Sequence, residues 1–412
     1  MPKRRCGERD GGGKKAKPRQ KHHLYLLFDD WESGYSIRKI KFPLPSDDSG
    51  EGVDEQRGEQ LLPPVAQRLP VAWWRLVAPR ELPQYFTSAF GAMIVPLHYT
   101  DGSSAVQMID VHARSILPGT RSNCPVNPIY FPVGSDKLFA LDARVIEVCC
   151  LLPPKQNDSE SDGDDDSLMD ESYAEYVSES DYASNSKGKW RWQQLAVTPF
   201  SMMDISSYAM LHDGQTILIC TNSDYPGHPP AATFTFDTGK AVWNRLGEWA
   251  LPFTGRGCFD PDLRALVGLS KGQGDLGYIY ACNVPRSDGW VPAWKRSKEK
   301  VFGKNPAETH VSASLIYMGH RSKFCLVECV CVKEDNADQV RVKEHNPDQV
   351  TEPEGVGGVP ELSHYMYRLM TFSLKIDTMD VLRIKHSRVK YYKVPNKTST
   401  EFIHEGPVAF WL

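Results

Sequence analysis

Short apolar runs separated by polar turns dominate the chain, and they predict β-strands. The clearest stretch spans residues 205–253, where apolar runs at 205–210 and 216–220 flank the turn His212-Asp-Gly, and an alternating run follows at 232–237. The Asp-Gly pair suits the positive φ angles of a tight hairpin. No segment carries the 3.6-residue apolar period of an amphipathic helix. The 31 Gly and 30 Pro residues fit a turn-rich chain, so the sequence predicts an all-β protein.

The same order of strands recurs along the chain, with a third strand that ends near Asp or Asn and a fourth that carries an aromatic residue. Trp192, Trp243 and Trp294 lie 51 residues apart in the fourth strands of three successive copies. Such a repeat, at roughly 40–50 residues, is typical of the four-stranded blades of a β-propeller. The copies that can be aligned span residues 85–118, 129–200, 205–253, 255–302 and 310–386.

Two segments remain outside the copies: a hairpin at 23–42 and a strand-like stretch at 401–412. A propeller must close its ring so that no strand edge stays exposed, and the two chain ends can supply one composite blade. We therefore expect a single β-propeller over residues 22–412, with six four-stranded blades. Seven blades stay open because residues 360–400 can be divided differently. A pair of β-sandwiches competes, but it explains no 51-residue interval.

Three stretches read as loops within this domain. Residues 43–70 are rich in Pro, Gly and acids and indicate a loop or linker. Residues 153–188 form an acidic insertion that we expect to be disordered. Residues 333–362 form a polar insertion with an internal duplication of 332–340 by 342–350, which we interpret as loop expansion because long surface loops cost little extra closure entropy.

The net charge of −4 hides an uneven distribution. Residues 1–23 carry a charge of +7 and residues 158–186 carry −11, so the rest of the chain is neutral. A neutral body is a poor ligand for phosphate backbones, and no apolar run is long enough to span a membrane. We expect no specific nucleic-acid binding, no membrane insertion and a monomer. The basic, glycine-rich start lacks the apolar core of a secretory signal, so we expect a location in the nucleus, the cytoplasm or both.

The two charged segments carry the candidate modification and targeting sites. Residues 1–21 predict a disordered tail whose two basic clusters resemble a nuclear import signal; its residues are Lys3, Arg4, Arg5, Lys14, Lys15, Lys17 and Arg19. The alternative is a solubilising tail, or one that associates weakly with nucleic acid. Ser159, Ser161 and Ser178 each precede an acid by three residues, a context that indicates possible phosphorylation in the acidic insertion.

Several sequence phrases carry a family resemblance. The opening phrase is His23-Leu-Tyr-Leu-Leu-Phe-Asp-Asp, and the other phrases lie at residues 34–40, 205–209, 212–217, 233–238, 249–253, 259–263 and 266–269. Over about residues 22–393 the chain resembles a grass-expanded plant family of kelch-like proteins, domain of unknown function 1668. The resemblance implies a kelch- or galactose-oxidase-like propeller of plant origin and no assigned activity. The chain lacks the double glycine of kelch repeats, which implies different packing near the axis.

Three sequence patterns resemble cofactor or metal sites, but each has a simpler structural interpretation. Gly272, Gly274 and Gly277 have the spacing of a dinucleotide fingerprint, but a strand follows them where a helix is required. Residues 158–169 imitate half of a calcium-binding loop and place Met169 where a bidentate Glu is needed. Cys325, Cys329 and Cys331 share one face of a strand, which we interpret as small buried hydrophobic residues. We predict no cofactor, metal site or catalytic residue.

The sequence thus favours a non-enzymatic scaffold that binds unidentified proteins through loops on a propeller face. Tyr225–His228 and Arg286–Trp290 are the loop candidates, because they combine aromatic and charged residues. The alternatives are an enzyme that uses the mouth of the central channel, and a nuclear protein that touches nucleic acid through its tail. A converging cluster of His, Arg and carboxylates would favour the enzyme.

Overall fold

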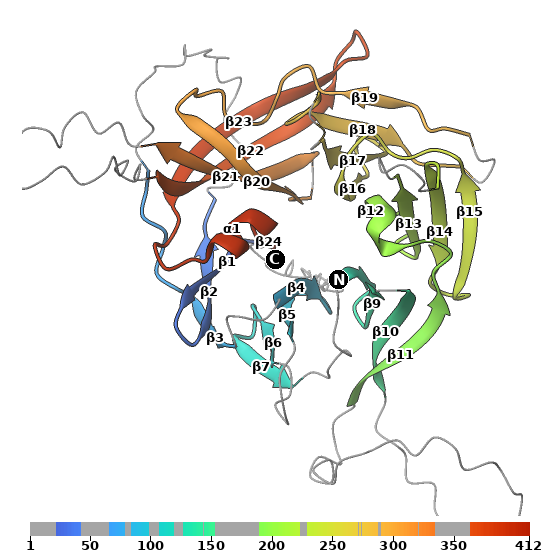
Figure 1. Cartoon of the computed structure of the whole chain (residues 1–412), viewed down its shortest axis with the longest axis horizontal. Coiled ribbons are helices and arrows are strands. Elements are labelled where there is room, and N and C mark those ends of the chain that lie inside the picture. The colour runs from blue at the N-terminus through green and yellow to red at the C-terminus, as the bar shows by residue number, and fades with distance from the viewer. Residues whose placement is uncertain are drawn as a thin grey trace, which may run out of the picture.

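Most of the strands predicted from the sequence are present in the computed structural model. The described residues are 22–42, 66–78, 84–98, 107–118, 127–142, 144–152, 189–222, 229–270, 272, 274–286, 290–319, 321–333 and 363–412. They form an all-β, propeller-like fold in which several four-stranded sheets surround a centre (Figure 1). Among these residues, no helix is long and apolar enough to cross a membrane.

The two ends of the chain meet in one sheet. Strand β24 (Ala409–Trp411) pairs antiparallel with β1 (Leu24–Trp31), and β2 (Gly34–Ile40) and β3 (Trp74–Val77) complete the order β24-β1-β2-β3. His23 and Leu412 extend the pairing with two backbone hydrogen bonds, of 2.6 and 3.1 Å. The prediction that the chain ends combine in one sheet is therefore confirmed.

Three further four-stranded sheets are antiparallel meanders. Their strands are β4 (Gln84–Ala89), β5 (Met93–His98), β6 (Gln107–Asp110) and β7 (Ser115–Pro118); β8 (Ile129–Val133), β9 (Lys137–Asp142), β10 (Val145–Leu152) and β11 (Lys189–Val197); and β20 (Glu308–Tyr317), β21 (Lys323–Lys333), β22 (Ser363–Ile376) and β23 (Leu382–Lys393).

An eight-stranded sheet consists of two such meanders joined edge to edge. Its strands are β12 (Ile205–Met210), β13 (Thr216–Thr221), β14 (Ala232–Asp237), β15 (Val242–Gly247), β16 (Gly255–Asp260), β17 (Ala265–Leu269), β18 (Ile279–Asn283) and β19 (Trp294–Arg296). The first strands of the two meanders, β12 and β16, pair in parallel at Ser207–Gly255 and the two following residues. Trp192, Trp243 and Trp294 lie in β11, β15 and β19, each the last strand of its meander, as the 51-residue interval predicts.

The core is divided among apolar clusters that lie between neighbouring meanders. One cluster joins β1 to β21 and β22 through Phe28, Cys325 and Tyr367, and another joins β17 and β18 to β21 and β22. Strands inside a meander are therefore buried on both faces: every residue of β17 is buried. This explains why these strands read as continuous apolar runs rather than alternating ones. Cys325 and Cys329 are fully buried in these contacts, as their apolar surroundings predict.

Glycine permits one close contact in this core. The ring of Phe253, which is 2% exposed, occupies the place that a side chain on Gly268 of β17 would need. Ile279 and Leu269 pair directly across the next hairpin, so Gly272, Gly274 and Gly277 lie in the connection between two strands, as predicted for the glycine-rich segment.

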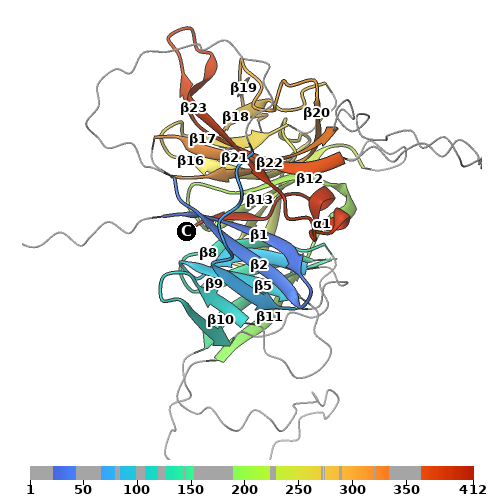
Figure 2. The ribbon, with the colours of Figure 1, turned by 90° about the vertical axis from the view of Figure 1, so that its left-hand side faces the viewer.

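One secondary-structure prediction is wrong. The expected strand-like stretch 401–412 begins with a short helix, α1 (Thr400–Glu405), and only Ala409–Trp411 is a strand. The Ser399 side chain accepts a hydrogen bond from the backbone N–H of Phe402 and caps the helix. Phe402 and Ile403 are buried and Gly406 ends the turn at φ 122°. Figure 2 places α1 on one face of the ring and the C-terminus toward the other.

Several predicted segments lie outside the described residues: the tail 1–21, the acidic insertion 153–188, most of the loop 43–70 and the polar insertion after Lys333. Strand β10 ends at Leu152 and β11 begins at Lys189, and β21 ends at Lys333 and β22 begins at Ser363.

The closing strand gives a stability prediction. Phe410 pairs with Tyr25, is 9% exposed and packs in the cluster that joins the first sheet to β5 and β6. Phe410→Ala is expected to lower the free energy of unfolding by about 3–5 kcal/mol, the usual cost of emptying a buried aromatic site. Urea unfolding followed by tryptophan fluorescence measures the change.

The matched control is Val389→Ala in β23, because Val389 is 42% exposed on an outer strand. Its expected cost is below about 1 kcal/mol. Equal losses in the two variants would contradict a special role for the closing strand.

Candidate functional site

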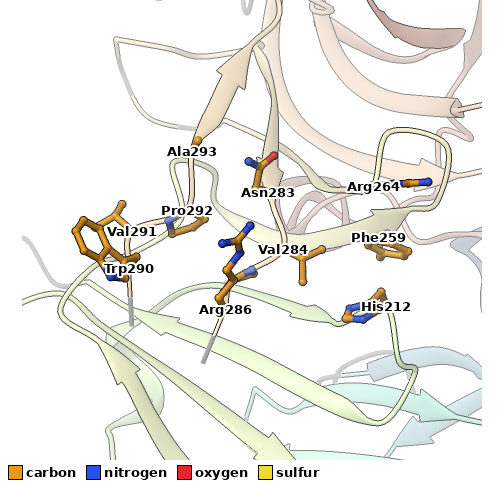
Figure 3. A pocket seen from close by; sticks show the side chains of 11 residues that line it. His212, Phe259, Arg264, Asn283, Val284, Arg286, Trp290, Val291, Pro292 and Ala293 are labelled. Carbon is orange, nitrogen blue, oxygen red and sulfur yellow. The ribbon is translucent and has the colours of Figure 1, made fainter. Parts of the chain in front are cut away.

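A pocket of about 690 Å³ opens between three turns of the eight-stranded sheet. The β12–β13 turn supplies His212, the end of β16 and its following turn supply Phe259 and Arg264, and the β18–β19 connection supplies the rest. Figure 3 shows His212 and Phe259 at one end, Trp290 and Val291 at the other, and Arg286 between them. The lining residues are His212, Phe259, Arg264, Asn283, Val284, Pro285, Arg286, Trp290, Val291, Pro292 and Ala293.

The lining combines cations with exposed apolar surface. Arg264 and Arg286 are exposed, and neither forms an ion pair with another described residue. No Asp or Glu is among the described residues that line the pocket. Trp290 is 78% exposed and Val291 is 64% exposed, and large apolar side chains this accessible often mark an interaction surface. The pocket therefore offers positive charge and apolar contact together.

The wall that carries Arg264 is fixed by a buried carboxylate. Asp260 is fully buried, and its Oδ1 accepts hydrogen bonds from the backbone N–H groups of Asp262 (2.9 Å) and Leu263 (3.0 Å) and from the Ser322 hydroxyl (3.0 Å). The turn then places Arg264 at φ 52°, in the left-handed region. Burial raises the pKa of Asp260, although these hydrogen bonds oppose the shift.

The same turn occurs elsewhere in the chain. Asp110 accepts from the N–H groups of the residues two and three positions later, and so does Asp237, and the fourth residue after each has a positive φ. Asp at a strand end thus forms the turn that follows. This accounts for Asp110 and Asp237, which end the third strands of their meanders, and it assigns them a structural role.

A second carboxylate holds the turn that carries His212. Asp213 accepts hydrogen bonds from the backbone N–H groups of Gln215 and Thr216, both at 2.9 Å, and from the Thr216 hydroxyl at 2.6 Å. Burial alone would raise the pKa of Asp213, but these hydrogen bonds hold it below its ordinary value. The turn sets His212 against Phe259, with ring centroids 5.8 Å apart.

The third wall is anchored at both of its ends. The backbone N–H of Asn283 donates to the carbonyl of Ala293 at 2.9 Å, and Pro285 and Pro292 restrict the chain on either side. Arg286 and Trp290, predicted from the sequence as loop candidates, both line the pocket. Tyr225–His228 lie outside the described residues.

A second pocket, of about 440 Å³, is less suited to a partner. Its aromatic rings pack on one another, as Phe200 does on Trp243 at 5.2 Å, and Arg245 already pairs with Glu248. Asp204 adds a carboxylate to the lining. We therefore consider the larger pocket the candidate functional site.

A buried polar cluster lies between β20–β22 and the segment before β20. The Glu328 carboxylate, 1% exposed, pairs with the Arg368 guanidinium at 3.0 Å and accepts a hydrogen bond from the backbone N–H of Gly303 at 3.1 Å. The Nδ1 atom of the His310 ring lies 3.0 Å from its other oxygen. Arg368 also donates to the carbonyl of Val301 at 2.7 Å. Both carboxylate oxygens are engaged by internal groups, so the cluster clamps this segment to the sheet.

The remaining candidate residues divide into two groups. The import-signal residues Lys3, Arg4, Arg5, Lys14, Lys15, Lys17 and Arg19 and the phosphorylation candidates Ser159, Ser161 and Ser178 lie outside the described residues. Within the described part, no group of three or more His, Cys, Asp or Glu side chains is placed to hold a metal ion.

Sequence reasoning missed His212, Phe259 and Arg264 as lining residues. They come from turns of two different meanders, and only the parallel contact of β12 with β16 brings those turns together. The Asp-Gly turn after His212 is predicted from the sequence, whereas the turn before Arg264 is not. No local sequence pattern shows that these two turns face one pocket.

Fold and pocket together define an all-β, propeller-like protein with a basic and aromatic pocket among its turns. The chain belongs to the family described as "Protein of unknown function (DUF1668)", whose model matches residues 21–367. This confirms the predicted membership in domain of unknown function 1668.

Similar solved structures are distant. A protein from Lactobacillus plantarum is 10% identical, with a TM-score of 0.40, over 95% of this chain and 99% of that chain. A Pseudomonas aeruginosa periplasmic gluconolactonase is 10% identical, with a TM-score of 0.37, over 91% and 99%. An oligogalacturonate lyase in complex with manganese is 11% identical, with a TM-score of 0.36, over 91% and 75%. No curated protein matches the chain.

The turn at Arg264 gives the second prediction. A non-glycine residue in the left-handed region lowers the free energy of unfolding by roughly 1–2 kcal/mol. A glycine at the same position avoids this strain but lowers it by about 0.5–1 kcal/mol through lost backbone entropy. Arg264→Gly is therefore expected to change the free energy of unfolding by less than about 1 kcal/mol. The β-branched variant Arg264→Val is expected to lose about 1–2 kcal/mol more. Urea unfolding of both variants measures this, and equal stability of the two would contradict a strained turn.

The two carboxylates give a pH prediction of opposite sign. The raised pKa of Asp260 means that its contribution to stability is largest below the unfolded value of about 3.9 and falls as the pH rises through the folded value. Asp260→Asn keeps the Oδ1 acceptor and removes the charge. Its stability relative to the wild type is expected to improve from about pH 3 to about pH 7.

Asp213→Asn is the matched comparison. The lowered pKa of Asp213 contributes stability above the unfolded pKa, and this contribution is lost as the pH falls through the folded value. Asp213→Asn is therefore expected to become less stable than the wild type as the pH rises over the same interval. Urea midpoints measured across the interval test both signs, and parallel curves for the two variants would refute the assignment.

Proposed function

We propose that this protein is a non-enzymatic interaction scaffold built on a six-bladed β-propeller of the kelch type. The sheet order supports the blade count, because the eight-stranded sheet divides at the parallel β12–β16 contact into two four-stranded blades. With the four separate sheets, this makes six blades. The shared family carries no assigned activity, so the function rests on the pocket.

One observation carries the scaffold proposal: the pocket joins a 78% exposed tryptophan to unpaired arginines. Trp and Arg are the residues that most often dominate the binding energy of protein interfaces. The lining comes from turns that rigid sheets hold in place, the usual position of recognition residues. We propose that a segment of a partner protein binds here, with Trp290 as an anchor.

The polar cluster around Glu328 supports no catalytic role. It is the convergence of His, Arg and carboxylate that an enzyme would need, yet both carboxylate oxygens already accept internal hydrogen bonds. A role for the tail in nuclear import or in weak nucleic-acid contact, phosphorylation of the acidic insertion, a monomeric state and an origin in grasses remain proposals based on the sequence.

The test compares partners of the wild type with those of two surface variants. Trp290→Ala removes the proposed anchor, and Met379→Ala removes an 80% exposed apolar side chain on the β22–β23 turn. The tagged full chain is expressed in cells that normally contain it, and captured proteins are quantified. At least one partner is expected to fall about tenfold with Trp290→Ala, in line with an interface hot spot, and to be unchanged with Met379→Ala. Capture that never depends on Trp290 would overturn the proposed function.

A further inference from the structure

We propose that the pocket recognises a carboxylate-rich peptide segment that carries a bulky apolar side chain next to its acids. This inference rests on the proposed scaffold function and names the chemistry of the partner. It follows from three features of the described lining residues: two cations, no carboxylate among them and an exposed apolar end.

The charge of the lining selects an anionic partner. The described ring outside the pocket mixes both signs, as in the pairs Arg383–Asp377 and Arg296–Asp275. Arg264 and Arg286, in contrast, have no acidic partner among the described residues. A guanidinium presents a planar fork of donors that fits a carboxylate with two parallel hydrogen bonds. The pocket thus presents two guanidinium groups that can each bind a carboxylate.

The geometry separates charge from apolar contact. In Figure 3, Arg264 lies near Phe259 at one end, Arg286 stands in the middle, and Trp290 and Val291 form the other end. A segment lying along this line would place an apolar side chain against Trp290 and carboxylates near Arg286 and Arg264. A leucine- or phenylalanine-type residue followed, on one side only, by aspartate or glutamate residues matches that order.

A peptide fits these features better than a polyanion does. Binding to a phosphate backbone depends on many cations acting together and gains little from exposed apolar surface. Two arginines beside Trp290 and Val291 suit a short segment that satisfies both charge and apolar contact. Neither feature alone gives much affinity, because charges this exposed are screened by water and salt.

The experiment selects short random peptides displayed on phage against the full chain, then measures purified fluorescent copies by anisotropy. The expected result is enrichment of Asp and Glu beside a bulky apolar residue. Arg286→Gln and Arg264→Gly are each expected to weaken binding about tenfold, as loss of a charge-assisted hydrogen bond does. Replacement of the peptide acids by Gln or Asn is expected to weaken it similarly.

The matched control is Arg388→Gln, which removes an exposed arginine from the outer strand β23. It is expected to leave affinity unchanged, and rising salt is expected to weaken binding to the wild type more than to Arg286→Gln. Equal unfolding midpoints show that each variant is folded.

The outcomes separate this inference from the proposed function. Enriched peptides that are neutral or basic, yet lose affinity with Trp290→Ala, would overturn the acidic specificity and leave the scaffold proposal standing. The acidic specificity would also be overturned if the selected peptides bind only after their Asp and Glu residues are replaced by phosphoserine. Peptides whose binding ignores both arginines and Trp290 would overturn the pocket as a binding site altogether.

Discussion

Closure of the ring by β24 on β1 is the constraint on which the rest of the structure depends. The apolar clusters lie between neighbouring meanders, so none is a complete core without its neighbour. The first sheet contributes to two of these clusters, one against β21–β22 and one against β5–β6. Without β24, the inner edge of β1 would present unpaired backbone groups, and Phe410 and Leu412 would leave the second cluster. A three-residue strand thus links residues that are almost the full chain length apart.

Burial on both faces of the sheets restricts where chemistry can reside. A strand such as β17 has no face left for recognition, because both sides pack against neighbouring meanders. Polar or aromatic residues that could contact a partner are therefore found on turns, connections and outer strands. The pocket follows this rule, since its residues come from the β12–β13 and β16–β17 turns, the end of β16 and the β18–β19 connection. One recurring turn type, with an Asp accepting two backbone N–H groups, then holds the segments that present His212 and Arg264.

This division also explains which features the sequence could predict. Apolar runs and the interval between Trp192, Trp243 and Trp294 predict the strands, since burial is a local demand on every residue of a strand. The helix at Thr400–Glu405 was missed because six residues show too little of a helical period, and its cap at Ser399 is the only signal. The loop residues Arg286 and Trp290 were predicted from composition alone. Their union with His212 and Arg264 depends on how adjacent meanders pair, which no local pattern encodes.

The same turns give the pocket its rigidity, and rigidity determines what it can recognise. Asp260 ties the turn of Arg264 to Ser322 of the next sheet, and Asp262 accepts the N–H groups of Arg321 and Ser322 there at 2.7 and 3.2 Å. The backbone under Arg264 is thus fixed before any partner arrives, while its exposed guanidinium stays hydrated. Binding then loses less backbone entropy, but screened charges contribute only modestly. A partner therefore gains affinity only if it pairs with the arginines and packs on the tryptophan at the same time. This joint requirement would let a solvent-open pocket discriminate among acidic segments.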